Sequence, residues 1–228
     1  MNKGIFLSVI LFFALVLVPT SNAAAYFETF DSNSGGWETW FINGSLYTGG
    51  SSDWSATGGN LDGHIFATFN GTDDLYAFDS PENQFGDLTG QTLMVDYKIS
   101  GTALPADAKV RWYIGSQTDG NNYFVSKDSF SWDPNADTDW TTHTIAINEA
   151  NFDRWTIGDA GTKTFAEVVA EGQWAGLFFL DGNQYGISSL DGATVSIDNI
   201  GAVPIPGVVW LLGSSLIGIF GFKRKYRK

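Results

Sequence analysis

Short runs of alternating apolar and polar residues fill most of the chain, and clusters of Gly, Asn, Asp and Ser separate these runs. Alternation with a period of two is typical of β-strands that bury one face, and such clusters are typical of turns. Helical periodicity is almost absent. The pattern therefore predicts an all-β domain, an antiparallel β-sandwich of the jelly-roll type. Its clearest strands are expected at residues 63–69, 93–99, 110–116, 122–128, 140–147, 174–180 and 194–200.

One short segment has a helical signature instead. Thr164 is a good N-cap residue, and Glu167 follows it three positions later, which is the spacing of a capping box. Gly172 can end the helix in a left-handed conformation. We predict one short helix over residues 164–172, inserted between two strands.

The start of the chain has the pattern of a secretory signal peptide, residues 1–23. Lys3 supplies positive charge, fourteen mostly apolar residues follow at positions 5–18, and small residues flank Asn22. The apolar stretch is short for a membrane span. We predict cleavage after Ala23, with cleavage after Ala24 or Ala25 as the alternatives.

The end of the chain, residues 203–228, has a different signature. Val203-Pro204-Ile205-Pro206 precedes sixteen mostly apolar residues, 207–222, and a basic end, 223–228. At ~1.5 Å per residue, a helix of this length covers about 24 Å, less than the ~30 Å hydrocarbon core of a bilayer. The pattern predicts a marginal transmembrane helix with its basic end in the cytoplasm, which suits a signal that is held in the membrane and then removed.

This tail resembles the PEP-CTERM sorting signal of Gram-negative bacteria. The likeness rests on the paired prolines, the apolar helix with its Trp-Leu-Leu-Gly segment, and the basic cluster; Ile205 stands where that family usually has Glu. It implies export across the inner membrane, and signal peptidase is the partner expected to remove the N-terminal signal peptide. It also implies transient anchoring in the membrane, processing by an exosortase-type enzyme, and display on the surface or release into an exopolysaccharide or biofilm matrix.

Between these ends, residues 24–202 form the predicted domain. It holds six of the basic residues and all 25 acidic ones, a net charge of −19. Such a field repels phosphate backbones, which argues against a nucleic-acid partner, and it attracts divalent cations. The chain has no cysteine. An apolar core rather than disulfide bonds must therefore stabilise this exported domain.

The sequence holds no recognisable catalytic constellation. His143 alternates with Ile145 and Ile147, which favours a packed core histidine, and His64 opens a strand without a nearby nucleophile. No nucleophile elbow or histidine-rich metal motif is present. Pairs of carboxylates suit glycoside hydrolysis, but 25 acidic residues make chance proximity expected. We therefore predict no enzymatic activity.

A structural calcium ion is the one cofactor that the acidic residues suggest, at either of two places. Asp133, Asn135, Asp137 and Asp139 alternate along one loop, so their oxygens can converge if the loop curls. Thr138 and Thr144 depart from the helix–loop–helix calcium pattern. The alternative interpretation is a solvated acidic loop.

The second possible calcium site joins the two ends of the domain. First and last strands of a sandwich often lie side by side, which would let Glu28, Asp31 and Asp198 share one ion. We prefer this site, and ordinary surface carboxylates are the alternative.

Eight tryptophans lie between residues 24 and 202. Most large aromatic side chains are buried, so each single tryptophan is expected in the core, whereas an exposed ring would offer a stacking platform for sugars. Trp54 and Trp132 lie in polar loop sequences and are the expected exceptions. We predict these two as ligand-binding residues.

The middle of the chain resembles laminin-B-type (domain IV) modules, which are jelly rolls akin to carbohydrate-binding modules. The likeness follows "TGGNLDGHIFAT", "AFDSPENQFGDLTGQTLMVDYKISG", "DWTTHTIAI", "FAEVVA" and "SIDNI" in order. Together with the tail, it implies a surface-sorted, non-catalytic protein that binds glycan or matrix components. A purely structural matrix protein is the alternative, and a glycan-active enzyme is a more distant one.

Overall fold

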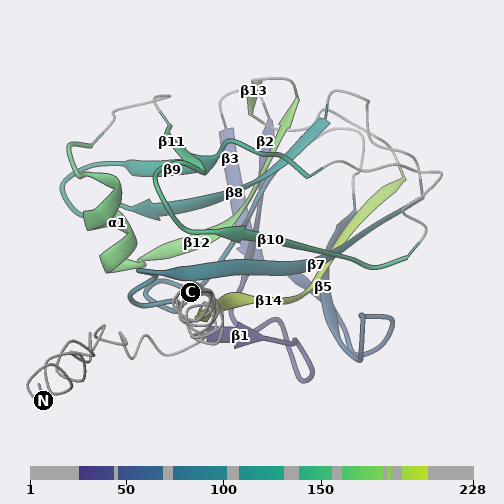
Figure 1. Cartoon of the computed structure of the whole chain (residues 1–228). Coiled ribbons are helices and arrows are strands. Elements are labelled where there is room, and N and C mark those ends of the chain that lie inside the picture. The colour runs from purple at the N-terminus through teal and green to yellow at the C-terminus, as the bar shows by residue number, and fades with distance from the viewer. Residues whose placement is uncertain are drawn as a thin grey trace, which may run out of the picture.

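The computed structural model describes residues 26–43, 46–68, 74–101, 108–130, 139–155, 161–181, 184–185 and 192–204. These residues form two antiparallel sheets and one short helix (Figure 1). The predicted signal peptide (residues 1–23) and residues 205–228 lie outside the described part of the chain. Within that part, no helix is both long and apolar enough to cross a bilayer.

The first sheet is built around the last strand, β14 (Ala193–Pro204). Its order is β10 (Thr141–Ala146), β7 (Gln91–Gly101), β14, β5 (His64–Thr68) and β4 (Asp53–Ser55). The first strand, β1 (Tyr26–Glu28), also pairs with β14. The predicted adjacency of the first and last strands is therefore confirmed.

The second sheet is wider and carries the remaining strands. Its order is β11 (Phe152–Arg154), β9 (Asn122–Ser126), β8 (Ala108–Ser116), β12 (Trp174–Asp181), β6 (Asp74–Asp79), β2 (Glu38–Asn43) and β3 (Leu46–Ser51), and β13 (Gln184–Tyr185) pairs with β12. The bounds of the strands confirm all seven predicted segments. They also bear out the strand expected at the start of the domain, β1, and add β2, β3, β4, β6, β11 and β13, which we did not predict.

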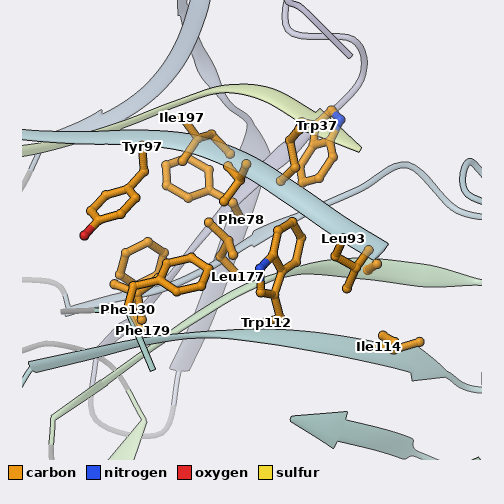
Figure 2. Packing of buried hydrophobic residues seen from close by; sticks show 14 of the residues in the cluster. Trp37, Phe78, Leu93, Tyr97, Trp112, Ile114, Phe130, Leu177, Phe179 and Ile197 are labelled. Carbon is orange, nitrogen blue, oxygen red and sulfur yellow. The ribbon is translucent and has the colours of Figure 1, made fainter. Parts of the chain in front are cut away.

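The apolar core lies between the two sheets. Trp37, Trp112, Phe78 and Phe179 are fully buried there, and Figure 2 shows them packed with Leu93, Ile197 and their neighbours. Burial of such rings supplies the stabilisation that disulfides do not. His143 packs against Tyr97 and Phe130 at ring-centroid distances of 4.7 and 4.4 Å, as expected of a histidine on the apolar face.

The helix α1 (Phe165–Glu171) confirms the capping prediction. The Thr164 side chain accepts a hydrogen bond from the Glu167 backbone N–H, and the Glu167 carboxylate accepts one from the Thr164 N–H. Gly172 ends the helix in the left-handed region. The apolar side of α1 lies in the main core through Phe165, Val168 and Val169, next to β8 and β9.

Candidate functional site

A groove lined by aromatic side chains lies on the outer face of the second sheet, the face turned away from the main core. Its volume is about 440 Å³, within the range of ligand-binding clefts. Among the described residues, ten line the groove, and seven of them are aromatic: Trp40, Tyr47, Tyr76, Tyr113, Tyr123, Trp155 and Phe178, with Asp79, Gln117 and Asn121 as the polar members. We call it the aromatic groove.

The floor of the aromatic groove is a row of stacked rings across three neighbouring strands. Tyr113 of β8 stacks on Phe178 of β12, with ring centroids 4.0 Å apart and planes 11° from parallel. Phe178 stacks in turn on Tyr76 of β6 at 5.2 Å. Tyr113 and Phe178 are 1% and 3% exposed although they face away from the core. The row therefore forms a second apolar layer.

Aromatic side chains also flank this row on both sides. Trp40 of β2 is half-buried against the row, and Tyr47 of the edge strand β3 is 46% exposed and meets Tyr76 edge to face. Tyr123 of β9 and Trp155 pack on the side of Phe178. Partly exposed rings on a fixed apolar floor are suited to stack on a flat ligand surface.

Glycines on three strands give these rings their space. A Cβ at Gly49 of β3 would lie 2.4 Å from the Trp40 ring, and one at Gly115 of β8 would lie 2.4 Å from the Tyr123 ring. A Cβ at Gly176 of β12 would come within 2.8 Å of the Tyr113 ring. Real side-chain carbons do not approach this closely, so glycine at these positions lets the rings lie close to the sheet.

Asp79, at the end of β6, is the acidic group of the groove. The Tyr113 hydroxyl donates a hydrogen bond to its Oδ1. Burial among the rings raises the pKa of Asp79 to about 7; the Tyr113 hydrogen bond opposes this rise and the charge of Glu38 adds to it. Burial also raises the pKa values of Tyr113 and Tyr123. Both phenols therefore stay protonated at neutral pH and act as hydrogen-bond donors.

Glu38 is the register neighbour of Asp79 on β2. The two carboxyl groups thus sit side by side on one face, and Asp79 alone of the two lines the groove. Hydrolysis of a glycosidic bond needs two carboxyl groups on opposite sides of the bond. The described lining residues do not offer such a pair.

The predicted ligand-binding tryptophans lie elsewhere. Trp54 is on β4, at the edge of the first sheet; it is 36% exposed and its indole N–H donates to the Phe30 carbonyl at 2.6 Å. Trp132 lies outside the described residues. Their role in ligand binding stays a prediction.

The preferred calcium ligands take part in different hydrogen bonds. The Glu28 carboxylate accepts a hydrogen bond from the Phe30 N–H, and Asp31 is exposed. The Asp198 carboxylate accepts from the Asn60 and Asn199 N–H groups, both at 2.7 Å. No group of three His, Cys, Asp or Glu side chains suited to a metal ion occurs among the described residues.

The other predicted sites fall wholly or partly outside the described residues. Asp133, Asn135 and Asp137 lie outside them, while Asp139 is exposed and pairs with Lys98 at 3.5 Å. The cleavage residues Ala23 and Ala24 also lie outside, as do Ile205 and Pro206 of the sorting motif. Val203 and Pro204 complete β14, opposite Thr92 and Gln91 of β7.

Sequence analysis missed the residues of the aromatic groove. Trp40 and Trp155 were expected in the core like other tryptophans, and Tyr76, Tyr113 and Phe178 were not singled out. A usable signal was present in two strands. In "VRWYIGS" (110–116) and "WAGLFFL" (174–180) apolar residues follow one another directly, which indicates that both faces of the strand are covered.

Comparison with known proteins finds distant structural likenesses. No family model and no curated protein matches the chain. A family 11 carbohydrate-binding module from Clostridium thermocellum, solved with a β-1,3-1,4-mixed-linked tetrasaccharide, is 14% identical, with a TM-score of 0.46 over 79% of this chain and 97% of that one. The L4b domain of human laminin alpha-2 is 12% identical, with a TM-score of 0.47 over 81% and 99%.

A third similar structure is the CBM22-1 xylan-binding domain of Xyn10C from Paenibacillus barcinonensis. It is 10% identical, with a TM-score of 0.41 over 78% of this chain and 91% of that one. Laminin domains and carbohydrate-binding modules, the two types named in the sequence resemblance, thus both occur among the similar structures. At these identities and TM-scores the likenesses carry no conclusion about function.

The buried carboxyl of Asp79 predicts a pH dependence of stability. Its pKa of about 7 in the folded state exceeds the ordinary value of 3.8, so the folded state binds more protons between these values. The contribution of Asp79 to the free energy of unfolding is fully present below pH ~4 and is lost as the pH rises through ~7. Urea unfolding at pH 5 and pH 8 should show a smaller loss of stability in Asp79→Asn than in the unchanged protein. Equal losses would contradict the raised pKa.

The calcium prediction has a direct test in the melting temperature. An ion that binds only the folded state stabilises it by ~2.7 kcal/mol at a hundred times its Kd. Millimolar Ca²⁺ should then raise the melting temperature by several degrees over chelator. Asp198→Asn should remove most of the rise and Asp137→Asn should not. An unchanged melting curve rules out both sites, and loss of the rise in Asp137→Asn alone places the ion in the 133–139 loop.

Proposed function

We propose that this protein binds glycan chains in the aromatic groove, as a non-catalytic β-sandwich. The observation that carries the proposal is the groove itself, in which seven aromatic side chains and three polar ones line a cleft on the outer face of the second sheet. Sugar rings present flat C–H faces that pack on aromatic rings, and their hydroxyl groups pair with carboxyl, amide and phenol groups. Both kinds of partner are present here.

The rigidity of the site supports this proposal. Tyr113 and Phe178 are buried within the sheet face, and the Tyr113 hydroxyl is held by Asp79. Rings that are already fixed lose little side-chain entropy when a ligand binds, so more of the contact energy appears as affinity.

The cellular setting is also part of the proposal. A signal peptide at residues 1–23 and a sorting tail at residues 203–228 would export the domain and anchor it transiently, until signal peptidase and an exosortase-type enzyme have processed the two ends. A glycan-binding domain released there would meet exopolysaccharide at the surface of a Gram-negative cell. A purely structural matrix protein would need the same export signals but not the groove.

Removal of one ring of the groove tests the proposal. Binding of the purified protein to a panel of soluble polysaccharides, measured by affinity electrophoresis and calorimetry, should identify at least one ligand. Trp40→Ala and Trp155→Ala should each weaken that binding about tenfold, because loss of one aromatic contact costs ~1.5 kcal/mol.

Trp54→Ala is the matched control, since it removes the same side chain from the edge of the first sheet. If the aromatic groove, and not the position of Trp54 that the sequence suggests, holds the ligand, this variant should bind as the unchanged protein does. If Trp54→Ala abolishes binding while the two groove variants retain it, the ligand binds at the first sheet and the groove assignment is wrong. If no polysaccharide binds, the purely structural alternative is favoured.

Two adjacent glycines allow a finer test of the groove geometry. A Cβ at Gly49 would strike the Trp40 ring, whereas a Cβ at Gly50 meets nothing within 4 Å. Gly49→Ala should therefore displace Trp40 and weaken glycan binding about as much as Trp40→Ala. Gly50→Ala, in the same edge strand, should leave it unchanged. Equal binding by both variants, measured by calorimetry, would show that the position of Trp40 is unimportant.

A further inference from the structure

Asp79 presents an unused carboxyl oxygen to the aromatic groove. Oδ1 accepts the hydrogen bond of the Tyr113 hydroxyl, while Oδ2 accepts none from the described residues. Asp79 is half-buried and lines the groove, so this oxygen can reach a ligand. A carboxyl among rings forms stronger hydrogen bonds with a charged donor than with a neutral one.

Among the described residues, no positively charged side chain forms an ion pair with Asp79. Its register neighbours are Glu38 on β2, which adds negative charge, and Gly176 on β12, which has no side chain. The phenols Tyr76, Tyr113 and Tyr123 are neutral donors, and Gln117 and Asn121 are neutral amides. Arg111 lies two residues from Tyr113 on β8 but does not line the groove, and none of the described lining residues is Lys, Arg or His.

The surroundings thus favour a cation at this position. The rings offer negatively polarised faces, which attract an ammonium group. The domain as a whole, at a net charge of −19 between residues 24 and 202, attracts cations and repels anions over longer distances. Burial of its carboxyl group is the main cause of the raised pKa of Asp79, and the negative charge of Glu38 adds to it.

We propose that the aromatic groove selects glycans by charge, with Asp79 as the specificity-determining residue and amino sugars that carry a free ammonium group as the preferred ligands. The inference rests on the proposed function and narrows its substrate class. The ammonium group donates to Asp79 Oδ2 while the sugar ring packs on the aromatic side chains. Neutral sugars lack the charged donor, and uronic acids are repelled by Glu38 and by the net negative charge of the domain.

Three short chains of equal length test this selectivity: hexamers of glucosamine, of N-acetylglucosamine and of galacturonic acid. At pH 6.5 and 0.15 M salt, the unchanged protein should bind the glucosamine hexamer about tenfold tighter than the N-acetylated one, the worth of one charge-assisted hydrogen bond. The galacturonic acid hexamer should bind weakest. In Asp79→Asn, the difference between the first two chains should disappear.

The control for overall charge is Asp62→Asn, which removes the same charge from an exposed position between β4 and β5 of the first sheet. It should keep the full preference for the glucosamine hexamer. A second readout uses the unchanged protein. Calorimetry in buffers of different ionisation enthalpy should show that binding of the glucosamine hexamer at pH 6.5 releases more protons from the unchanged protein than from Asp79→Asn, because the ammonium group displaces the proton of Asp79.

Each other outcome overturns the inference. If the glucosamine and N-acetylglucosamine hexamers bind equally and Trp40→Ala weakens both, the groove binds glycans without charge selection, and the proposed function stands. If glucosamine binding survives both Asp79→Asn and Trp40→Ala, the polymer is held by the acidic surface alone. If neither these hexamers nor any member of the polysaccharide panel binds, the proposed function fails together with the inference.

Discussion

The pairing of the last strand with three others is the constraint on which the rest of the structure depends. β14 pairs with β7 along almost its whole length, and on its other side it pairs first with β5 and then with β1. The change of partner occurs where the register shifts between Asp198 and Gly201, next to Asn199 in a left-handed conformation. β14 thereby joins the two halves of the first sheet and brings the two ends of the domain together.

The outer faces of the two sheets are covered in different ways. On the first sheet, Asp96 and Asp198 lie opposite each other on β7 and β14, and Asn60 from the loop before β5 binds both, through its side chain and its backbone N–H respectively. This network of polar side chains and the loop that carries Asn60 cover the outer face of the first sheet at this point. On the second sheet the rings of Tyr113, Phe178 and Tyr76 take the corresponding place without a covering loop among the described residues, and the aromatic groove lies on that face.

The strands that we predicted correctly are those in which the residues of the segment themselves favour a β-strand. β7, β8 and β12 are rich in aliphatic and aromatic residues between clear turns, so local sequence located them. β3 was missed because "LYTGGS" contains two glycines, which weaken a strand signal. The same Gly49 makes room for Trp40, so the residue that hides the strand from sequence analysis also shapes the groove.

The groove was beyond sequence reasoning for a related reason. Whether an aromatic residue lies in the core or on the outer face depends on the direction in which its strand presents it. The register between β2 and β6 shifts at this point, because Trp40 pairs with Ala77 and Phe41 with Leu75, which leaves Tyr76 as the extra residue on β6. A bulge of this kind depends on the partner strand β6 and has no local signature. Trp54 was selected because its neighbours are polar, yet its indole N–H is bound to Phe30. Polar neighbours indicate an exposed segment, whereas a binding surface requires several rings that tertiary pairing brings together.

The groove also shows how a domain of high negative charge can keep an apolar binding surface. Tyr113 and Phe178 are almost fully buried by their neighbours on the same face, so the row of rings is stabilised within the sheet and does not need a ligand to cover it. The rings that remain partly exposed, Trp40, Tyr47 and Trp155, lie around this fixed floor. The net charge of −19 opposes association of copies of the domain, which counteracts the tendency of exposed aromatic side chains to promote self-association.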